Sequence, residues 1–141
     1  MKASSAFILA AAVGIAGCKR IASRDVEGDW TIKDSSRAVL PDQMRSARSE
    51  IRLQPDGTFV ATSVPDLLAD PAHPQRFDSG HGRWTLIARQ GRQQVQLTFD
   101  AISDWHGPLP YGTQLGVSRG ELFYFVGDPD EGRVVSFHKR K

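Results

Sequence analysis

Short runs in which apolar and polar side chains alternate recur along the chain from Val26 onward, and clusters of Gly, Pro and Asp separate them. A period of two places successive side chains on opposite faces of a β-strand. The clearest hairpin joins residues 49–53 to 58–64 through Pro55-Asp56-Gly57, because proline presets its backbone angle and glycine accepts a positive φ. The whole pattern predicts eight antiparallel strands, at residues 28–33, 49–53, 58–64, 81–88, 94–99, 114–117, 121–126 and 133–138.

Two stretches, residues 64–78 and 100–112, contain prolines that cannot donate ladder hydrogen bonds, so both are predicted to be loops. Residues 41–44 and 66–69 leave room only for brief helical turns. The side chains predicted to face inward are mostly large, which favours a largely filled interior over a deep cavity. They are Trp30, Ile32, Ile51, Leu53, Phe59, Trp84, Leu86, Val95, Leu97, Phe99, Leu115, Val117 and Phe137.

An eight-stranded meander can close into an up-and-down barrel, which removes exposed strand edges; an open β-sandwich is the second choice. Gly28-Asp29-Trp30 resembles the Gly-x-Trp motif of lipocalins and related calycins, in which the tryptophan plugs one end of the barrel. That resemblance implies an all-β, lipocalin-like barrel. The segments Asp56-Gly57-Thr58-Phe59 and Gly127-Asp128-Pro129-Asp130 are similar to segments of small uncharacterised envelope lipoproteins, and this likeness implies no particular activity.

The amino-terminal segment has the features of a signal peptide. Lys2 precedes an apolar run of eleven residues, 6–16, whereas a membrane-spanning helix needs about 20. Ile15-Ala16-Gly17-Cys18 then resembles the lipobox of bacterial lipoproteins. The resemblance implies cleavage between Gly17 and Cys18 and acylation at Cys18 with chains such as palmitate. Two or three acyl chains on one cysteine hold a protein durably on a bilayer, whereas one chain holds it only reversibly.

These features divide the chain into a signal peptide (1–17), a lipidated tether (18–26) and a single β-domain (27–141). The tether is predicted from its polarity and its lack of apolar periodicity. In lipoproteins of bacteria with two membranes, a residue other than aspartate after the cysteine usually permits transfer to the outer membrane, and Lys19 fits that pattern. The expected location is therefore the cell envelope, on the periplasmic face of the outer membrane, with the membrane as one partner.

Composition supports one folded domain, since 24% of the residues are charged and 40% are hydrophobic. Eighteen basic residues against 16 acidic ones lack the strong positive excess of nucleic-acid-binding domains, so no nucleic-acid partner is expected. A single cysteine cannot form an internal disulfide. The one basic cluster, residues 138–141, could contact anionic headgroups or form a solvated tail.

No catalytic, metal or cofactor motif is recognisable, and no enzyme activity is predicted. Residues 103–106 contain Ser, Asp and His, but a nucleophile, a base and an orienting group rarely converge from adjacent positions of one loop. Residues 128–132 bring three carboxylates together without the spacing of a calcium-binding EF-hand. Paired ligand spacing is absent from the four histidines, His73, His81, His106 and His138.

The candidate contact residues lie in the second predicted loop. Trp105, His106 and Tyr111 are interspersed with Gly and Pro, and rigid aromatic side chains of this kind anchor protein partners or stack on sugars. Burial beneath the loop is the structural alternative. The leading hypothesis is a non-catalytic binding or interaction module for a protein or glycan. The alternatives are a lipocalin-like carrier of a small apolar ligand and a hydrolase that uses residues 103–106.

Overall fold

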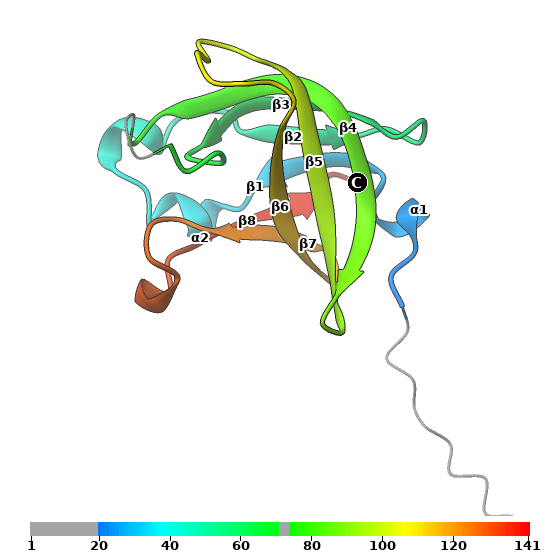
Figure 1. Cartoon of the computed structure of the whole chain (residues 1–141). Coiled ribbons are helices and arrows are strands. Elements are labelled where there is room, and N and C mark those ends of the chain that lie inside the picture. The colour runs from blue at the N-terminus through cyan, green and yellow to red at the C-terminus, as the bar shows by residue number, and fades with distance from the viewer. Residues whose placement is uncertain (1–19, 71–73) are drawn as a thin grey trace, which may run out of the picture.

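The computed structural model describes residues 20–70 and 74–141, so the predicted signal peptide, Cys18 and His73 lie outside the described residues. Eight antiparallel strands form one closed barrel, in which each strand pairs with the next and β8 pairs with β1 (Figure 1). The predicted all-β, lipocalin-like barrel is confirmed, and the open sandwich is wrong. The strands are β1 (Gly28–Ile32), β2 (Glu50–Leu53), β3 (Thr58–Pro65), β4 (Phe77–Arg89), β5 (Arg92–Ile102), β6 (Tyr111–Ser118), β7 (Glu121–Phe125) and β8 (Val134–Lys139).

Tight turns join consecutive strands where the sequence predicts them. In the turn between β2 and β3, Gly57 has a φ of +85°. The carboxylate of Asp56 accepts hydrogen bonds from the hydroxyl and the backbone N–H of Thr58, at 2.6 and 2.9 Å, and these bonds lower the pKa of Asp56. Between β4 and β5, Gln90 and Gly91 have φ values of +50° and +74°. Positive φ at both central residues gives the twist that a two-residue hairpin needs.

The central strands β4 and β5 are longer than predicted and shorten the loops beside them. Each exceeds its predicted range, 81–88 and 94–99 respectively, at both ends. One cause is Gly80, in the part of β4 that was not predicted, where an added Cβ would overlap the Ala101 carbonyl of β5. Close backbone approach requires glycine at a position where a pattern-based prediction looks for an apolar side chain.

Short helices lie at the two ends of the barrel. The α1 end carries α1 (Ser23–Val26), and the opposite end, here called the loop end, carries α2 (Asp34–Arg37) (Figure 1). Two single 3₁₀ turns, η1 (Asp42–Met44) and η2 (Pro129–Glu131), complete the helical content of the described residues, and η1 matches the helical turn predicted there. None of the helices in residues 20–70 and 74–141 has the length and apolarity needed to cross a membrane.

Helix α1 falls within the segment predicted as a tether without secondary structure. Val26 is buried, and its carbonyl accepts a hydrogen bond of 2.8 Å from the indole N–H of Trp30. Trp30 is itself only 1% exposed, and the Lys139 ammonium lies 5.8 Å from the centre of its ring. The chain from residue 23 therefore packs on the barrel, because Val26 supplies an apolar side chain that covers its end.

The barrel interior is filled by side chains from all eight strands. Eleven of the thirteen predicted inward residues are buried, and the exceptions, Leu86 and Val117, are partly buried. The prediction missed Leu122, Tyr124 and Val135, which are also buried. On β7 the outward residues after Glu121 are Phe123 and Phe125, so both faces of this part of the strand are apolar and the period of two is hidden.

Candidate functional site

Strands β6 and β7 separate over part of their length. They pair only between residues 116–118 and 121–123, whereas β6 pairs with β5 over residues 111–116. Residues 111–115 of β6 therefore have a strand partner on one side only, within the part of the chain that the structure describes. Backbone N–H and C=O groups point alternately to the two sides of a strand. Every second residue of 111–115 thus presents an unpaired backbone edge toward β7.

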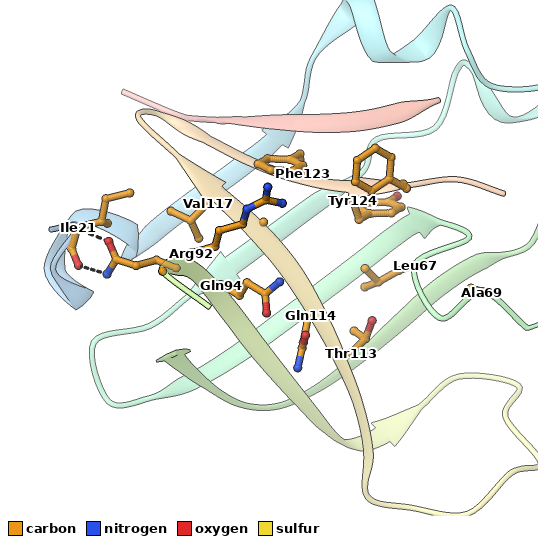
Figure 2. Close-up of a pocket in the computed structure, with 14 residues that line it drawn as sticks. Ile21, Leu67, Ala69, Arg92, Gln94, Thr113, Gln114, Val117, Phe123 and Tyr124 are labelled. Carbon is orange, nitrogen blue, oxygen red and sulfur yellow. Dashed lines mark hydrogen bonds between the residues drawn. The ribbon is translucent and has the colours of Figure 1, made fainter. Parts of the chain in front are cut away.

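A groove of about 580 Å³ lies where the two strands separate. It crosses the wall of the barrel, because its lining includes both inward-facing and outward-facing side chains. Figure 2 shows Leu67, from the loop between β3 and β4, lying between Tyr124 and Thr113. At the other end of the groove, the side-chain amide of Gln93 binds the backbone of Ile21. Its Oε1 accepts from the Ile21 N–H at 2.8 Å and its Nε2 donates to the Ile21 carbonyl at 2.7 Å, as the dashed lines in Figure 2 show.

One wall of the groove is rich in side-chain amides. The Nε2 of Gln114 donates a 2.9 Å hydrogen bond to Oε1 of Gln96. The Oε1 of the neighbouring Gln94 is buried and has no hydrogen-bond partner. A buried acceptor without a donor costs free energy, so each such atom in a native structure calls for an explanation. An acceptor that lines a groove is explained if a ligand supplies the donor.

The opposite wall is aromatic. The ring of Phe123 lies over Gly116, where an added Cβ would overlap the ring. Phe125, which is 47% exposed, meets Phe123 edge to face at 6.4 Å between ring centres. Tyr124 points inward and its hydroxyl donates a 2.5 Å hydrogen bond to the Pro65 carbonyl. Burial, reinforced by the charges of nearby aspartates, raises the pKa of Tyr124 well above its ordinary value, so this hydroxyl stays neutral and keeps the proton that it donates to Pro65.

A buried ion pair closes the loop end of the barrel beside the groove. Nε of Arg76 lies 2.6 Å from Oδ1 of Asp78, and Oδ2 of Asp78 accepts a 2.9 Å hydrogen bond from the backbone N–H of Leu68. Asp66 accepts from the backbone N–H of Arg76 at 3.0 Å. Burial raises the pKa of both aspartates despite these favourable partners. Nε of Arg76 and Oδ1 of Asp78 contact each other as an ion pair without forming a hydrogen bond. The hydrogen bonds that Asp66 and Asp78 accept from backbone N–H groups hold the loop that supplies Leu67.

The structure brings two of the three predicted contact residues together. The rings of Trp105 and Tyr111 lie 5.0 Å apart and meet edge to face. The Arg76 guanidinium lies 5.6 Å from the centre of the Trp105 ring, and the Tyr111 hydroxyl donates a long 3.5 Å hydrogen bond to the Leu68 carbonyl. Both aromatic residues are partly buried, which matches the structural alternative, whereas His106 is exposed and is not part of this contact. Their role in partner binding stays a prediction.

The hydrolase alternative depends on residues 103–106, which follow β5 in the described part of the chain. No hydrogen bond joins the side chains of Ser103, Asp104 and His106, all of which lie in the described part of the chain. A nucleophile–base hydrogen bond is the geometric mark of a hydrolytic triad. Residues 20–70 and 74–141 contain no group of three His, Cys, Asp or Glu side chains placed to hold a metal ion.

Sequence reasoning did not find the groove. Its existence depends on the different lengths of β6 and β7 and on their register, which leave eight residues beside five. The available indication was Gly116 opposite Phe123, and it has meaning only once the register is known. Comparison of the chain with protein-family models, with curated proteins and with solved structures gave no match.

Proposed function

We propose that the protein is a lipid-anchored, non-catalytic binding module of the cell envelope that receives an extended segment of a protein partner in the β6–β7 groove. The observation that carries this proposal is the open edge of β6 over residues 111–115. Extended peptides bind such edges by adding a strand, with main-chain hydrogen bonds providing affinity and side-chain pockets providing specificity. A peptide carries alternating N–H donors and C=O acceptors, which matches the alternating groups of the strand edge.

The groove lining supports the same ligand class. The buried Oε1 of Gln94 requires a donor, and a peptide N–H or a side-chain amide supplies one. Phe123 and Phe125 form an apolar surface for the side chains of the peptide. A glycan would satisfy the amides and stack on the aromatic rings, but it lacks the backbone pattern that complements a strand edge.

Attachment to the membrane rests on the lipobox-like Ile15-Ala16-Gly17-Cys18. The proposed location is the periplasmic face of the outer membrane. Metabolic labelling with palmitate tests the anchor: wild type should carry the label, and the Cys18→Ser variant should lose both the label and cleavage before residue 18. Wild-type chain with residues 1–17 still attached and no added acyl mass would contradict it.

A carrier of a small apolar ligand is the second candidate. A volume of about 580 Å³ falls within the range of about 300–1,000 Å³ that is typical of small-molecule sites, and Leu67 and Phe123 line the groove. Titration with a fluorescent lipid probe distinguishes the two candidates. Saturable probe binding that is lost in Thr113→Trp, without any peptide binding, would favour the carrier.

The test of the peptide proposal is selection from a phage-displayed random peptide library on the full-length chain in mild detergent. Thr113→Trp fills the groove and should abolish binding of the selected peptides. Thr85→Trp is the matched control, because Thr85 is an exposed strand residue on β4. Circular dichroism verifies that both variants fold. If selected peptides bind wild type and Thr113→Trp equally, the groove is not the site; if no peptide is selected, strand addition is refuted.

A further inference from the structure

Basic side chains gather at the α1 end of the barrel. Arg24 lies in α1, and Arg20 precedes that helix. Arg89 and Arg92 flank the β4–β5 turn, and Arg119 lies in the β6–β7 turn (Figure 1). Contacts join these segments. Arg20 and Arg119 line one hollow of about 360 Å³, and Gln93, next to Arg92, is bonded to Ile21. The chain therefore folds five separate arginines onto one end.

The carboxyl-terminal residues lie at the same end. The Lys139 ammonium donates a 3.1 Å hydrogen bond to the Asp25 carbonyl in α1, and the backbone N–H of Arg140 donates to the Asp29 carbonyl at 2.8 Å. Lys141 follows directly. The sequence showed residues 138–141 as one basic cluster, either a headgroup contact or a solvated tail, and the structure places residues 139–141 beside the other cations.

Most of these cations have no ion-pair partner. Six of them are exposed and make no salt bridge with any described carboxylate. They are Arg20, Arg24, Arg89, Arg92, Arg119 and Lys141. The carboxylates at this end include Asp29 and Glu121, which form ion pairs with Arg52 and Lys33. The others are Asp25, Glu27 and Asp56, and two of these accept local backbone N–H groups. The loop end carries six exposed acidic residues. Asp34, Asp42 and Glu131 pair with neighbouring arginines, whereas Asp104, Asp128 and Asp130 form no ion pair with a described residue.

We propose that the α1 end is a docking surface for an anionic lipid bilayer, which orients the barrel with its loop end away from the membrane. The inference rests on the proposed anchor for its geometry: Cys18 is two peptide steps, or at most about 7 Å of extended chain, from Arg20. A lipid at Cys18 would thus hold the six unpaired cations close to the headgroups. Basic residues near an anionic surface each contribute about fivefold in binding, and one lipid signal combined with a basic patch gives stable attachment.

Vesicle partitioning of the full-length Cys18→Ser chain tests the surface without the lipid. Two partition coefficients are measured, one on phosphatidylcholine vesicles that contain phosphatidylglycerol and one on vesicles of phosphatidylcholine alone. The readout is the ratio of the first to the second, because any contribution of the apolar residues 6–16 to membrane binding cancels in that ratio. Arg89→Gln/Arg119→Gln should lower this ratio roughly 25-fold, or fivefold for each arginine. The control, Arg45→Gln/Arg133→Gln, removes two exposed arginines from the loop end, where they lie beside Asp42 and Glu131, and should leave the ratio within about twofold of its starting value.

Equal effects of the two double variants would overturn the proposal, because the anionic preference would then follow net charge alone. A ratio near one for the starting chain would overturn it as well. Binding to soluble polyphosphate that depends on Arg89 and Arg119, with no anionic preference on vesicles, would assign the surface to a free acidic polymer instead. Arg92 lines the groove as well, but the tested residues Arg89 and Arg119 do not, so failure here leaves the peptide-binding test independent.

Discussion

The buried amide of Gln94 predicts a trade-off between stability and binding. Its Oε1 is buried beside the groove without a donor, and an unsatisfied buried polar group costs about 1–3 kcal/mol. The residue as a whole is only partly buried, so the lower end of that range applies. Gln94→Met keeps the length of the side chain and removes the acceptor. The free energy of unfolding of the ligand-free chain should rise by about 1 kcal/mol.

The matched control is the same substitution two residues along the same strand face. Oε1 of Gln96 accepts a hydrogen bond from Gln114, so Gln96→Met loses an interaction and should destabilise the chain by about 1 kcal/mol. Urea denaturation measures both variants, and fluorescence anisotropy of a selected peptide measures binding. Gln94→Met should bind the peptide about tenfold more weakly, since a ligand hydrogen bond of about 1.4 kcal/mol is lost.

Two results would refute this reasoning. A destabilised Gln94→Met variant would show that the amide oxygen is satisfied in the free chain. Unchanged peptide affinity in a stabilised variant would show that the ligand does not use Gln94, and the unpartnered oxygen would then have no functional explanation.

Three further predictions concern the residues around the groove. Tyr124→Phe removes the buried hydroxyl that donates to the Pro65 carbonyl and should lower the free energy of unfolding by about 1–2 kcal/mol in urea denaturation; no loss would contradict the bond. Gly116→Ala should cost about 1–3 kcal/mol because its Cβ overlaps the Phe123 ring, and Phe123→Ala in the same chain should recover part of that loss, which a double-mutant cycle measures. Burial raises the pKa of Asp78, so the folded chain holds that proton more tightly than the unfolded chain, and the group lowers stability as the pH rises from 3.8 through its folded pKa. The stability advantage of wild type over Asp78→Asn should therefore shrink across that interval, and an advantage that grows with pH would contradict the shift.

The barrel could be predicted from the sequence because its determinants are local. Alternation in segments such as residues 94–99 fixes which side chains face inward, and turns such as Pro55-Asp56-Gly57 fix the hairpins. Where outward side chains are also apolar, as at Phe123 and Phe125, the alternation disappears and the inward residues of that strand could not be identified.

The groove and the basic end depend on contacts between distant residues, which local patterns do not contain. The packing of Trp105 on Tyr111 involves Arg76 from another loop, so the sequence indicated aromatic residues of interest without indicating that they cover each other. In the same way, Arg20 and Arg119 are far apart in the chain but line one hollow. The α1 helix escaped prediction because one apolar residue, Val26, is sufficient to anchor it.

Amide hydrogen exchange of β6, followed by NMR with and without a selected peptide, tests the proposed edge most directly. In the free chain, the amides of residues 111–115 that point away from β5 should exchange much faster than the intervening amides that bond to β5. Peptide binding should slow that fast set selectively. Uniform protection of residues 111–115 in the free chain, or exchange that a bound peptide leaves unchanged, would contradict the account of β6 as an open edge that receives a strand.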